Sequence, residues 1–348
     1  MYSSHTCYHS SSMRLKYIDI AKGILILMVI YNHTVNLAVA SGIDNETINI
    51  TEKTHFFAPF FMPAFFIIAG MCSNYNKRFK DFALSNAKAL LIPAVTLLFV
   101  RIIVRYMLTG TFSRLEWGGL TSPKFIVNLG YWNWFLTALF TTKILFYFFL
   151  HVISSFKKRA LLILIIHIIG VLIYNIKGNG IISYNFYFYQ HALMYLIYIE
   201  IGYDLIKNDM KSPGLKVNTV VFLFVYVCYH FIGRKIPSIT SGPYLPMADI
   251  VPHLLMSVCG SLMIIELSKT IKDNSYLEDF GRHSLVIYCL HFQFIFSYYQ
   301  IFKQQLNSVG TRYTITALII MYVFTAYGCL WSSKLLNTKY FKWILGKF

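Results

Sequence analysis

The chain has 348 residues, of which 57% are hydrophobic and only 13% are charged, with 31 Lys and Arg against 14 Asp and Glu. Soluble globular proteins carry about 25% charged residues, so this composition excludes an ordinary water-soluble protein. It also excludes intrinsic disorder, which requires low hydrophobicity. The net charge of +17 lies in short basic clusters between apolar runs, which is typical of the loops of a membrane protein, so no nucleic-acid partner is expected.

The first 13 residues are polar and are predicted to form a disordered tail, with Met13 as an alternative start of the chain. His5, Cys7 and His9 lie in this tail, but no second cluster of ligands supports a metal site, so no metal is expected. Residues 14–348 are predicted to form one membrane domain. Five of the six cysteines lie in apolar runs and are interpreted as small core residues.

A membrane-spanning helix needs about 20 mostly apolar residues, and about ten runs of the chain are candidates. They are Tyr17–Ala40, Phe56–Cys72, Leu84–Leu108, Tyr131–His151, Ala160–Asn175, Tyr184–Ile206, Val217–Ile232, Ile250–Leu267, Ser284–Ile301 and Thr314–Leu336. None shows the period-two alternation of β-barrel strands. The predicted fold class is therefore all-α, a polytopic integral membrane protein with about ten transmembrane helices.

The charges of the loops predict the orientation. Taken alternately, one set of loops and ends carries 18 Lys and Arg, whereas the other set carries 8. Basic loops stay in the cytoplasm, so both termini are predicted to be cytoplasmic, as an even number of spans also requires. The expected location is the plasma (inner) membrane, with the lipid bilayer as a partner.

The first span holds Asp19, Lys22, Asn32 and His33, and ionisable groups inside a membrane helix mark functional sites. Lys22 and His33 are eleven residues apart, which corresponds to about three turns and about 16 Å of rise, so they share one face. Alternatively, Lys22 extends to the interface and His33 bonds a neighbouring helix. The shared face favours function.

The third span holds Lys88 near its start and Arg101 and Arg105 near its end. The two arginines are spaced i, i+4, so they either clamp an anion together or extend outward to the interface. Pro93 is predicted to kink this helix and to leave backbone carbonyls free to face a cavity.

Three later spans add further polar groups. The aromatic run Trp132–Phe135 is interpreted as part of an interfacial belt, Lys143 lies near mid-span without an assignable partner, and Glu200 is a candidate partner for a buried cation. Ser284, Tyr288 and His291 are spaced i, i+4 and i+7, which lines them along one stripe. A lone histidine there would be a packing residue, but three hydrogen-bonding side chains favour a cavity wall.

These residues have a familiar pattern. The run Tyr17–Gly23, followed by Asn32 and His33, resembles the first helix of the membrane-bound acyltransferase 3 family, where an Asp, an Arg or Lys before Gly, and a His occur at this spacing. Phe60–Gly70 and Trp134–Phe140 resemble its second and fourth helices, and Phe280–His291 resembles a late helix. Four motifs in the order that the family shows are stronger evidence than any one of them alone. The most similar subgroup contains the fucose 4-O-acetylase-like sugar O-acetyltransferases.

The resemblance implies transfer of an acetyl or other short acyl group from cytoplasmic acyl-CoA to a hydroxyl of a carbohydrate acceptor, in an envelope or capsular glycan or its precursor. Acetyl-CoA is then a donor substrate, and no bound cofactor is expected. His33 would be the general base, and Lys22 or Lys88 would meet the CoA phosphates. Candidates to stabilise the oxyanion are Asn32, Arg101, Tyr288 and His291, and the remaining expected substrate-binding residues are Asp19, Trp134 and Ser284.

The sequence departs from the family at two places. Lys22 stands where much of the family has Arg, and Lys88 is the one base before Pro93, where a pair of arginines is common.

Two other functions remain open at this point. A transporter or flippase for a lipid-linked sugar would share the apolar composition and the intramembrane charges, but it should show internal repeats or paired broken helices, and neither is clear here. An inactive scaffold of a polysaccharide-synthesis complex would not need His33.

Overall fold

The computed structural model describes residues 8–9, 13–40, 55–110, 133–178, 187–207, 210–232, 245, 247–271, 273–308 and 311–347. Most of the predicted N-terminal tail, including His5 and Cys7, lies outside the described residues, as does Trp132.

Helices make up nearly all of the described chain, and the two short strands β1 (Tyr8–His9) and β2 (Met13–Arg14) form one antiparallel pair. The helices are α1 (Lys16–Ala40), α3 (Phe61–Cys72), α4 (Phe79–Asn86), α5 (Ile92–Thr109), α8 (Trp134–Val152), α9 (Phe156–Gly178), α10 (Tyr187–Lys207), α11 (Leu215–Phe231), α12 (Ile250–Thr270), α13 (Ser275–Arg282), α14 (Ser284–Ser308) and α15 (Thr311–Leu336). Short segments are η1 (His55–Phe57), η3 (Met247–Asp249) and η4 (Lys342–Leu345), which are 3-10 turns, and η2 (Ala87–Leu91), which is π-helical.

The all-α fold class is confirmed, and each predicted span coincides with a described helix. Six helical segments of the described chain are long and apolar enough to cross a membrane: Lys16–Leu37, Phe79–Thr109, Trp134–Val152, Ile250–Thr270, Ser284–Phe302 and Thr314–Leu336. Helices α3 and α11 are apolar but shorter. The count of ten spans and the cytoplasmic termini stay predictions.

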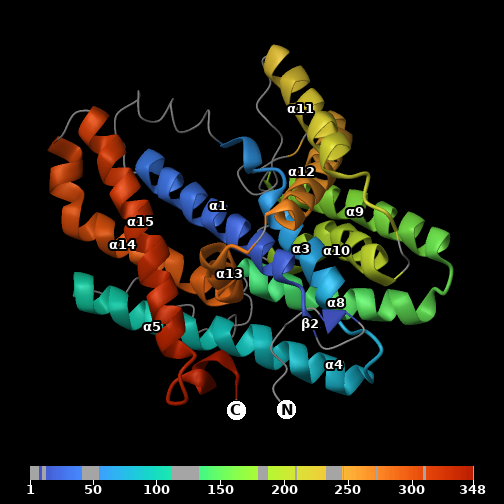
Figure 1. Ribbon diagram of the computed structural model, residues 1–348, viewed down its shortest axis with the longest axis horizontal. Coiled ribbons are helices and arrows are strands. Elements are labelled where there is room, and N and C mark those ends of the chain that lie inside the picture. Colours follow the sequence, from blue (N-terminus) through green and yellow to red (C-terminus); the bar gives the residue numbers. More distant parts are fainter. Residues whose placement is uncertain are drawn as a thin grey trace.

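Helix α1 runs through the middle of the bundle and packs against α3, α12, α13, α14 and α15 (Figure 1). Helices α8, α9 and α10 lie together beside α3, while α5 packs on α14 and α14 packs on α15. Most positions of α1 are buried, and of its ionisable side chains Asp19 is buried and Lys22 and His33 are half-buried, whereas Lys16 at the start of the helix is exposed.

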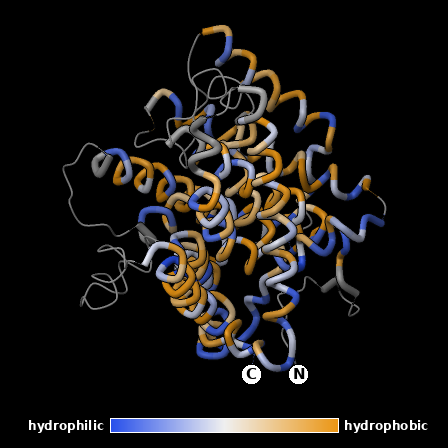
Figure 2. The backbone as a smooth tube through the Cα atoms, turned by 90° about the vertical axis from the view of Figure 1, so that its left-hand side faces the viewer, coloured by the Kyte–Doolittle hydropathy of each residue, from blue (hydrophilic) through white to orange (hydrophobic). Residues whose placement is uncertain are grey.

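Hydrophobic residues run along the helices of the bundle, including those at its periphery (Figure 2). Met107 of α5, Phe231 of α11 and Trp331 of α15 are among the large apolar side chains that are exposed. Exposed apolar surface on this scale is a liability in water but suits contact with lipid chains. The surface therefore agrees with the composition in indicating a membrane protein.

Helix α13 was not predicted, because its sequence lies in a polar stretch that the span analysis assigned to a loop. It begins after Asn274, whose side chain accepts a hydrogen bond from the backbone N–H of Leu277 at 3.0 Å. It then crosses α1 so closely that a Cβ at Gly281 would overlap the Asp19 carbonyl oxygen, and one at Gly23 would overlap the Leu277 carbonyl oxygen. Two glycines, one on each helix, thus permit the crossing.

The predicted irregularity at Pro93 is present as the π-helical turn η2, which joins α4 to α5. Proline has no backbone N–H, so a carbonyl in the preceding turn loses its partner. The Lys88 carbonyl oxygen of this turn lies directly against Gly346, and the expectation that freed carbonyls face a cavity stays a prediction. The C-terminal segment is held there by a hydrogen bond from Thr96 Oγ1 to the Ile344 carbonyl at 2.6 Å.

Glu200 was expected to pair with a buried cation, and that cation is Arg159. The count of loop charges had included Arg159 among the cytoplasmic bases. Arg159 is buried in α9, and its Nε lies 2.9 Å from both carboxylate oxygens of Glu200. Its guanidinium also reaches Asp204 at 3.4 Å. This buried charge group joins α9 to α10.

One cysteine departs from the interpretation as a free apolar residue, since Cys72 is disulfide-bonded. Cys289 and Cys329 are free and buried, as expected.

Candidate functional site

The candidate site forms where α1 meets α14. The ring of His33 lies 4.9 Å from that of His291 and 4.2 Å from that of Phe292, measured between ring centroids. His33 is half-buried, whereas His291 is 1% exposed. The two histidines that the sequence placed in distant motifs are therefore neighbours.

The hydrogen bonds of His291 fix its tautomer. Its Nδ1 lies 2.6 Å from the Tyr288 carbonyl oxygen and 3.2 Å from that of Ile287. Carbonyl oxygens only accept, so Nδ1 carries a proton, and in the neutral imidazole Nε2 then keeps a lone pair. Among the described residues that buried Nε2 has no hydrogen-bond partner. Such an atom is suited to bind a hydroxyl or another proton donor.

Arg101 of α5 adds a positive charge to this group. Its guanidinium lies 5.8 Å from the Phe292 ring centroid, and its charge acts on both Tyr288 and His291. Arg105 lies over Phe296 at 4.8 Å, so both arginines face α14, as their i, i+4 spacing predicted.

Tyr288 connects the group to α8. Its ring lies 5.7 Å from that of His291 and 5.0 Å from that of Phe135. The predicted stripe on α14 thus brings Tyr288 and His291 to the site, whereas Ser284 begins the helix seven residues earlier, about 10 Å from His291 along the axis.

A second charged group lies near the beginning of α1. Asp19 is buried, and its carboxylate lies 3.8 Å from Lys22 Nζ and 3.9 Å from Arg282 Nε of α13. The Lys22 charge also acts on the buried Lys143 of α8. Asp19 and Lys22 therefore belong to this basic end of the bundle, about 16 Å along α1 from His33.

The remaining predicted residues lie apart from the histidine pair or have a different environment. Asn32 is buried beside His33 in the chain. Lys88 lies in η2, next to the C-terminal segment. Trp134 packs on His191 at 4.6 Å and on Tyr195 at 6.0 Å, and its neighbour Phe135 contacts Tyr288 beside His291.

Three residues that contribute to these groups were not among the predicted site residues. Phe292 lies next to His291 in the family motif, and this adjacency was the available signal. Asn86, the hydrogen-bond partner of Lys143, is 57 residues away in the chain, so no spacing could indicate it. Phe135 looked like part of an interfacial belt but is buried against Tyr288.

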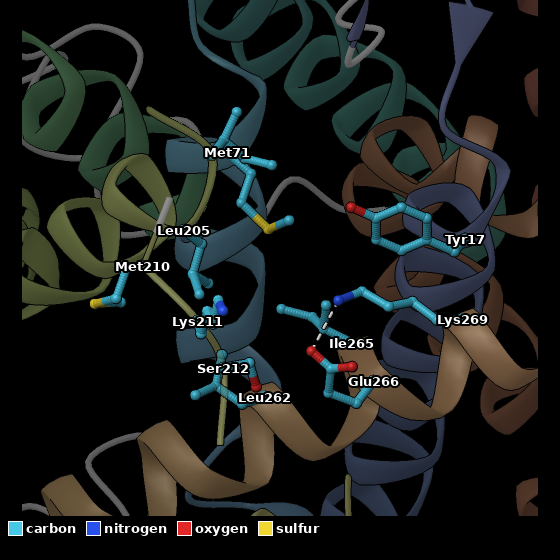
Figure 3. Close-up of a pocket in the computed structure, with 11 residues that line it drawn as sticks. Tyr17, Met71, Leu205, Met210, Lys211, Ser212, Leu262, Ile265, Glu266 and Lys269 are labelled. Carbon is cyan, nitrogen blue, oxygen red and sulfur yellow. Dashed lines mark hydrogen bonds and ion pairs between the residues drawn. The ribbon is translucent and has the colours of Figure 1, made fainter. Parts of the chain in front are cut away.

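A separate pocket of about 380 Å³ opens where α1 begins and where α10 and α12 end (Figure 3). Tyr17, Lys211 and Lys269 are among its lining residues, and Lys269 donates a hydrogen bond to Glu266 at 2.8 Å. His33 and His291 do not line it, so it is distinct from the histidine pair.

Of three comparisons with known proteins, one places the chain in a family. Neither the curated proteins nor the solved structures yield a match. A family model described as an acyltransferase domain, that of the acyltransferase 3 family, matches residues 15–334. The matched segment includes His33, Arg101, Tyr288 and His291, and the described helices agree with a membrane protein. The chain belongs to the acyltransferase 3 family and is a membrane acyltransferase.

Proposed function

We propose that the protein transfers an acetyl or other short acyl group from acyl-CoA to a sugar hydroxyl of an envelope or capsular glycan or its precursor. The contact between His33 and His291, whose Nε2 has no hydrogen-bond partner in the described part of the chain, is the observation that carries this proposal. Two imidazoles at one buried site supply a base and a hydrogen-bond acceptor near neutral pH. The family membership favours this reaction over the transport of a lipid-linked sugar.

In the proposed reaction, His33 removes the proton from the acceptor hydroxyl as its oxygen attacks the thioester carbonyl carbon. A carbon–oxygen bond forms, and the carbonyl oxygen becomes an oxyanion, which the positive charge of Arg101 stabilises. The oxyanion then collapses, the carbon–sulfur bond breaks, and the CoA thiolate takes the proton from His33. Nε2 of His291 accepts a hydrogen bond from the acceptor hydroxyl or from the protonated His33, which holds the proton donor in place.

The donor enters from the basic end of the bundle. CoA carries its phosphates far from its thioester, and α1 places Lys22 about 16 Å from His33. The loop charges predict that this end of the bundle lies in the cytoplasm, where acyl-CoA is available. The donor is therefore expected to enter from the cytoplasmic side.

The test is transfer of labelled acetyl groups from acetyl-CoA to glycan in membranes that contain the protein. We expect label in polysaccharide only when the protein is present. Transport of unlabelled glycan without any label transfer would contradict the proposal.

The proposed orientation has its own test. A reporter fused after Phe348, or inserted at Ser154 just before α9, is expected to report a cytoplasmic position, because both places adjoin the more basic set of loops and ends. An external position at either place would remove the cytoplasmic acyl-CoA route.

Arg101→Gln is expected to lower kcat by about 10²–10³-fold, because it removes a charge that stabilises the oxyanion. KM for the acceptor should change little, since the charge acts mainly in the transition state. The measurement is steady-state acetyl transfer at equal amounts of protein in membranes. Arg105→Gln is the matched control, because Arg105 lies on the same face over Phe296 and away from the histidine pair. Equal losses in both variants would remove Arg101 from the mechanism.

A further inference from the structure

The pocket between the ends of α1, α10 and α12 has both apolar and charged walls (Figure 3). More than half of its lining residues are apolar, among them Met71, Leu205 and Ile265, and the others are polar or charged. Its volume of about 380 Å³ is within the range of small-ligand sites. A pocket with this lining suits an amphiphilic ligand, which has a polar group and an apolar part.

The charged groups of the pocket leave one net positive charge. Its lining holds two lysines, Lys211 and Lys269, and one carboxylate, Glu266. Lys269 Nζ donates a hydrogen bond to Glu266 Oε1 at 2.8 Å, whereas Lys211 makes no ion pair within the described residues. A ligand with a single negative charge, such as a phosphodiester, would balance this pocket. The several phosphate charges of CoA would not be balanced there.

Hydrogen-bond donors from two helices point into the pocket. The hydroxyl of Tyr17, on α1, and the ammonium of Lys269, on α12, point into the same open space (Figure 3). Lys269 Nζ lies 5.6 Å from the centroid of the Tyr17 ring. An ammonium has three N–H donors, and Glu266 accepts one of them. Lys269 can therefore donate to a phosphate oxygen while it keeps its bond to Glu266.

The pocket lies where two candidate membrane spans end. Tyr17 is in the first turn of α1 and Lys269 is in the last turn of α12, and both helices are long and apolar enough to cross a membrane. The loop charges predict that this end is cytoplasmic, and the cytoplasmic leaflet is rich in anionic lipids, whose headgroups bind basic pockets between helices. Leu267 of α12 and Val217 of α11 are exposed apolar side chains close in the chain to the lining residues, so acyl chains have surface to contact.

We propose that this pocket binds the phosphodiester headgroup of an anionic phospholipid, with Tyr17, Lys211 and Lys269 as its donors. The bound headgroup joins the ends of α1, α10 and α12, so it stabilises the folded bundle. The inference does not rest on the acyl-transfer reaction. Lys22, to which the donor phosphates are assigned, does not line the pocket.

The first experiment compares two lipids. Phosphatidylglycerol is added to the purified full-length protein in neutral detergent, and the midpoint of thermal unfolding is followed as the lipid concentration rises. Phosphatidylcholine with the same acyl chains is the lipid control, because its headgroup has a phosphodiester but no net charge. Phosphatidylglycerol should raise the midpoint further, since a ligand that binds the folded state stabilises it. Equal rises with both lipids would overturn the inference.

Charge variants test the two lysines. Lys211→Gln should raise the apparent Kd for phosphatidylglycerol about fivefold, which is the contribution of one lysine near a membrane surface. Lys211→Gln combined with Lys269→Gln reverses the net charge of the pocket and should remove the preference for phosphatidylglycerol. Lys157→Gln combined with Lys158→Gln is the matched control, because these lysines of α9 are exposed and do not line the pocket. Equal losses in the two double variants would show a general effect of surface charge and overturn the inference.

Leu205→Trp tests the pocket without changing its charge. Leu205 is half-buried and lines the pocket, so a larger side chain there fills part of the space. The midpoint of this variant, measured against its own value without lipid, should no longer rise with phosphatidylglycerol. An undiminished rise would place the lipid elsewhere and contradict the proposal.

Two soluble ligands distinguish the lipid from other phosphates. Glycerophosphoglycerol is the same headgroup without acyl chains, and it should raise the midpoint much less than the lipid does. Any rise with CoA should be equal in wild type and in the double variant of Lys211 and Lys269. A rise with glycerophosphoglycerol as large as that with the lipid would show that the pocket takes free phosphate esters. A rise with CoA that the double variant loses would assign the pocket to the donor, and either result would refute the lipid site.

Discussion

His33→Ala is expected to lower the rate of acyl transfer by about 10²–10⁴-fold, because it removes the general base. The protein should still insert in the membrane, since His33 is only half-buried and the rest of α1 keeps its apolar contacts. The measurement is transfer of labelled acetyl groups from acetyl-CoA in membranes that hold equal amounts of each variant.

His230→Ala is the matched control, because His230 is an exposed histidine of α11 that is not part of the site. It should keep the activity of wild type. His291→Ala tests the neighbouring ring, and a loss similar to that of His33→Ala would show that the two histidines act as a unit. Activity of His33→Ala within a factor of about three of wild type would refute the proposed mechanism, because the loss of a general base costs far more.

Gly281→Val is expected to destabilise the protein by about 1–3 kcal/mol or more, through overpacking at the crossing of α1 and α13. Any Cβ at position 281 overlaps the backbone carbonyl oxygen of Asp19, and backbone atoms of two packed helices cannot rotate away. The same displacement would shift Asp19 and Lys22, so donor use should fall as well. The measurements are the midpoint of thermal unfolding in detergent and the KM for acetyl-CoA.

Gly328→Ala is the control for this prediction. A Cβ at Gly328 of α15 would approach the ring of Phe294 at 2.6 Å, but that neighbour is a side chain, which can adjust. Its midpoint should therefore fall less than that of Gly281→Val. The crossing would not need glycine if Gly281→Val unfolded at the temperature of wild type.

The helices were predictable because each is long or strongly apolar. A run such as Thr314–Leu336 has few polar residues, so its helical state in a membrane follows from its own backbone hydrogen bonds. Helix α13 was not predicted, because it is too short and too polar to be identified as a membrane span. It lies against α1 because Gly23 and Gly281 allow the backbones to touch, and that contact joins segments far apart in the chain.

The sequence also singled out candidate site residues, but it could not indicate their partners. The cost of placing an ionisable group in a membrane helix was enough to select Lys22, His33 and Lys143 without coordinates. In the same way, Glu200 was expected to meet a cation. Its partner Arg159 was assigned to a loop, because a base at the edge of an apolar run looks like part of the loop charge.

The membrane character, the apolar helices and the candidate residues can be inferred without coordinates, because hydrophobicity and the cost of buried charge are properties of each residue and its near neighbours. The contacts of His33 with His291 and Phe292, and of Lys143 with Asn86, become known from the packing of the helices alone. The physical reason is that these contacts depend on which helix faces pack together. That packing is set by close approaches such as Gly23 on Leu277, which no local pattern records.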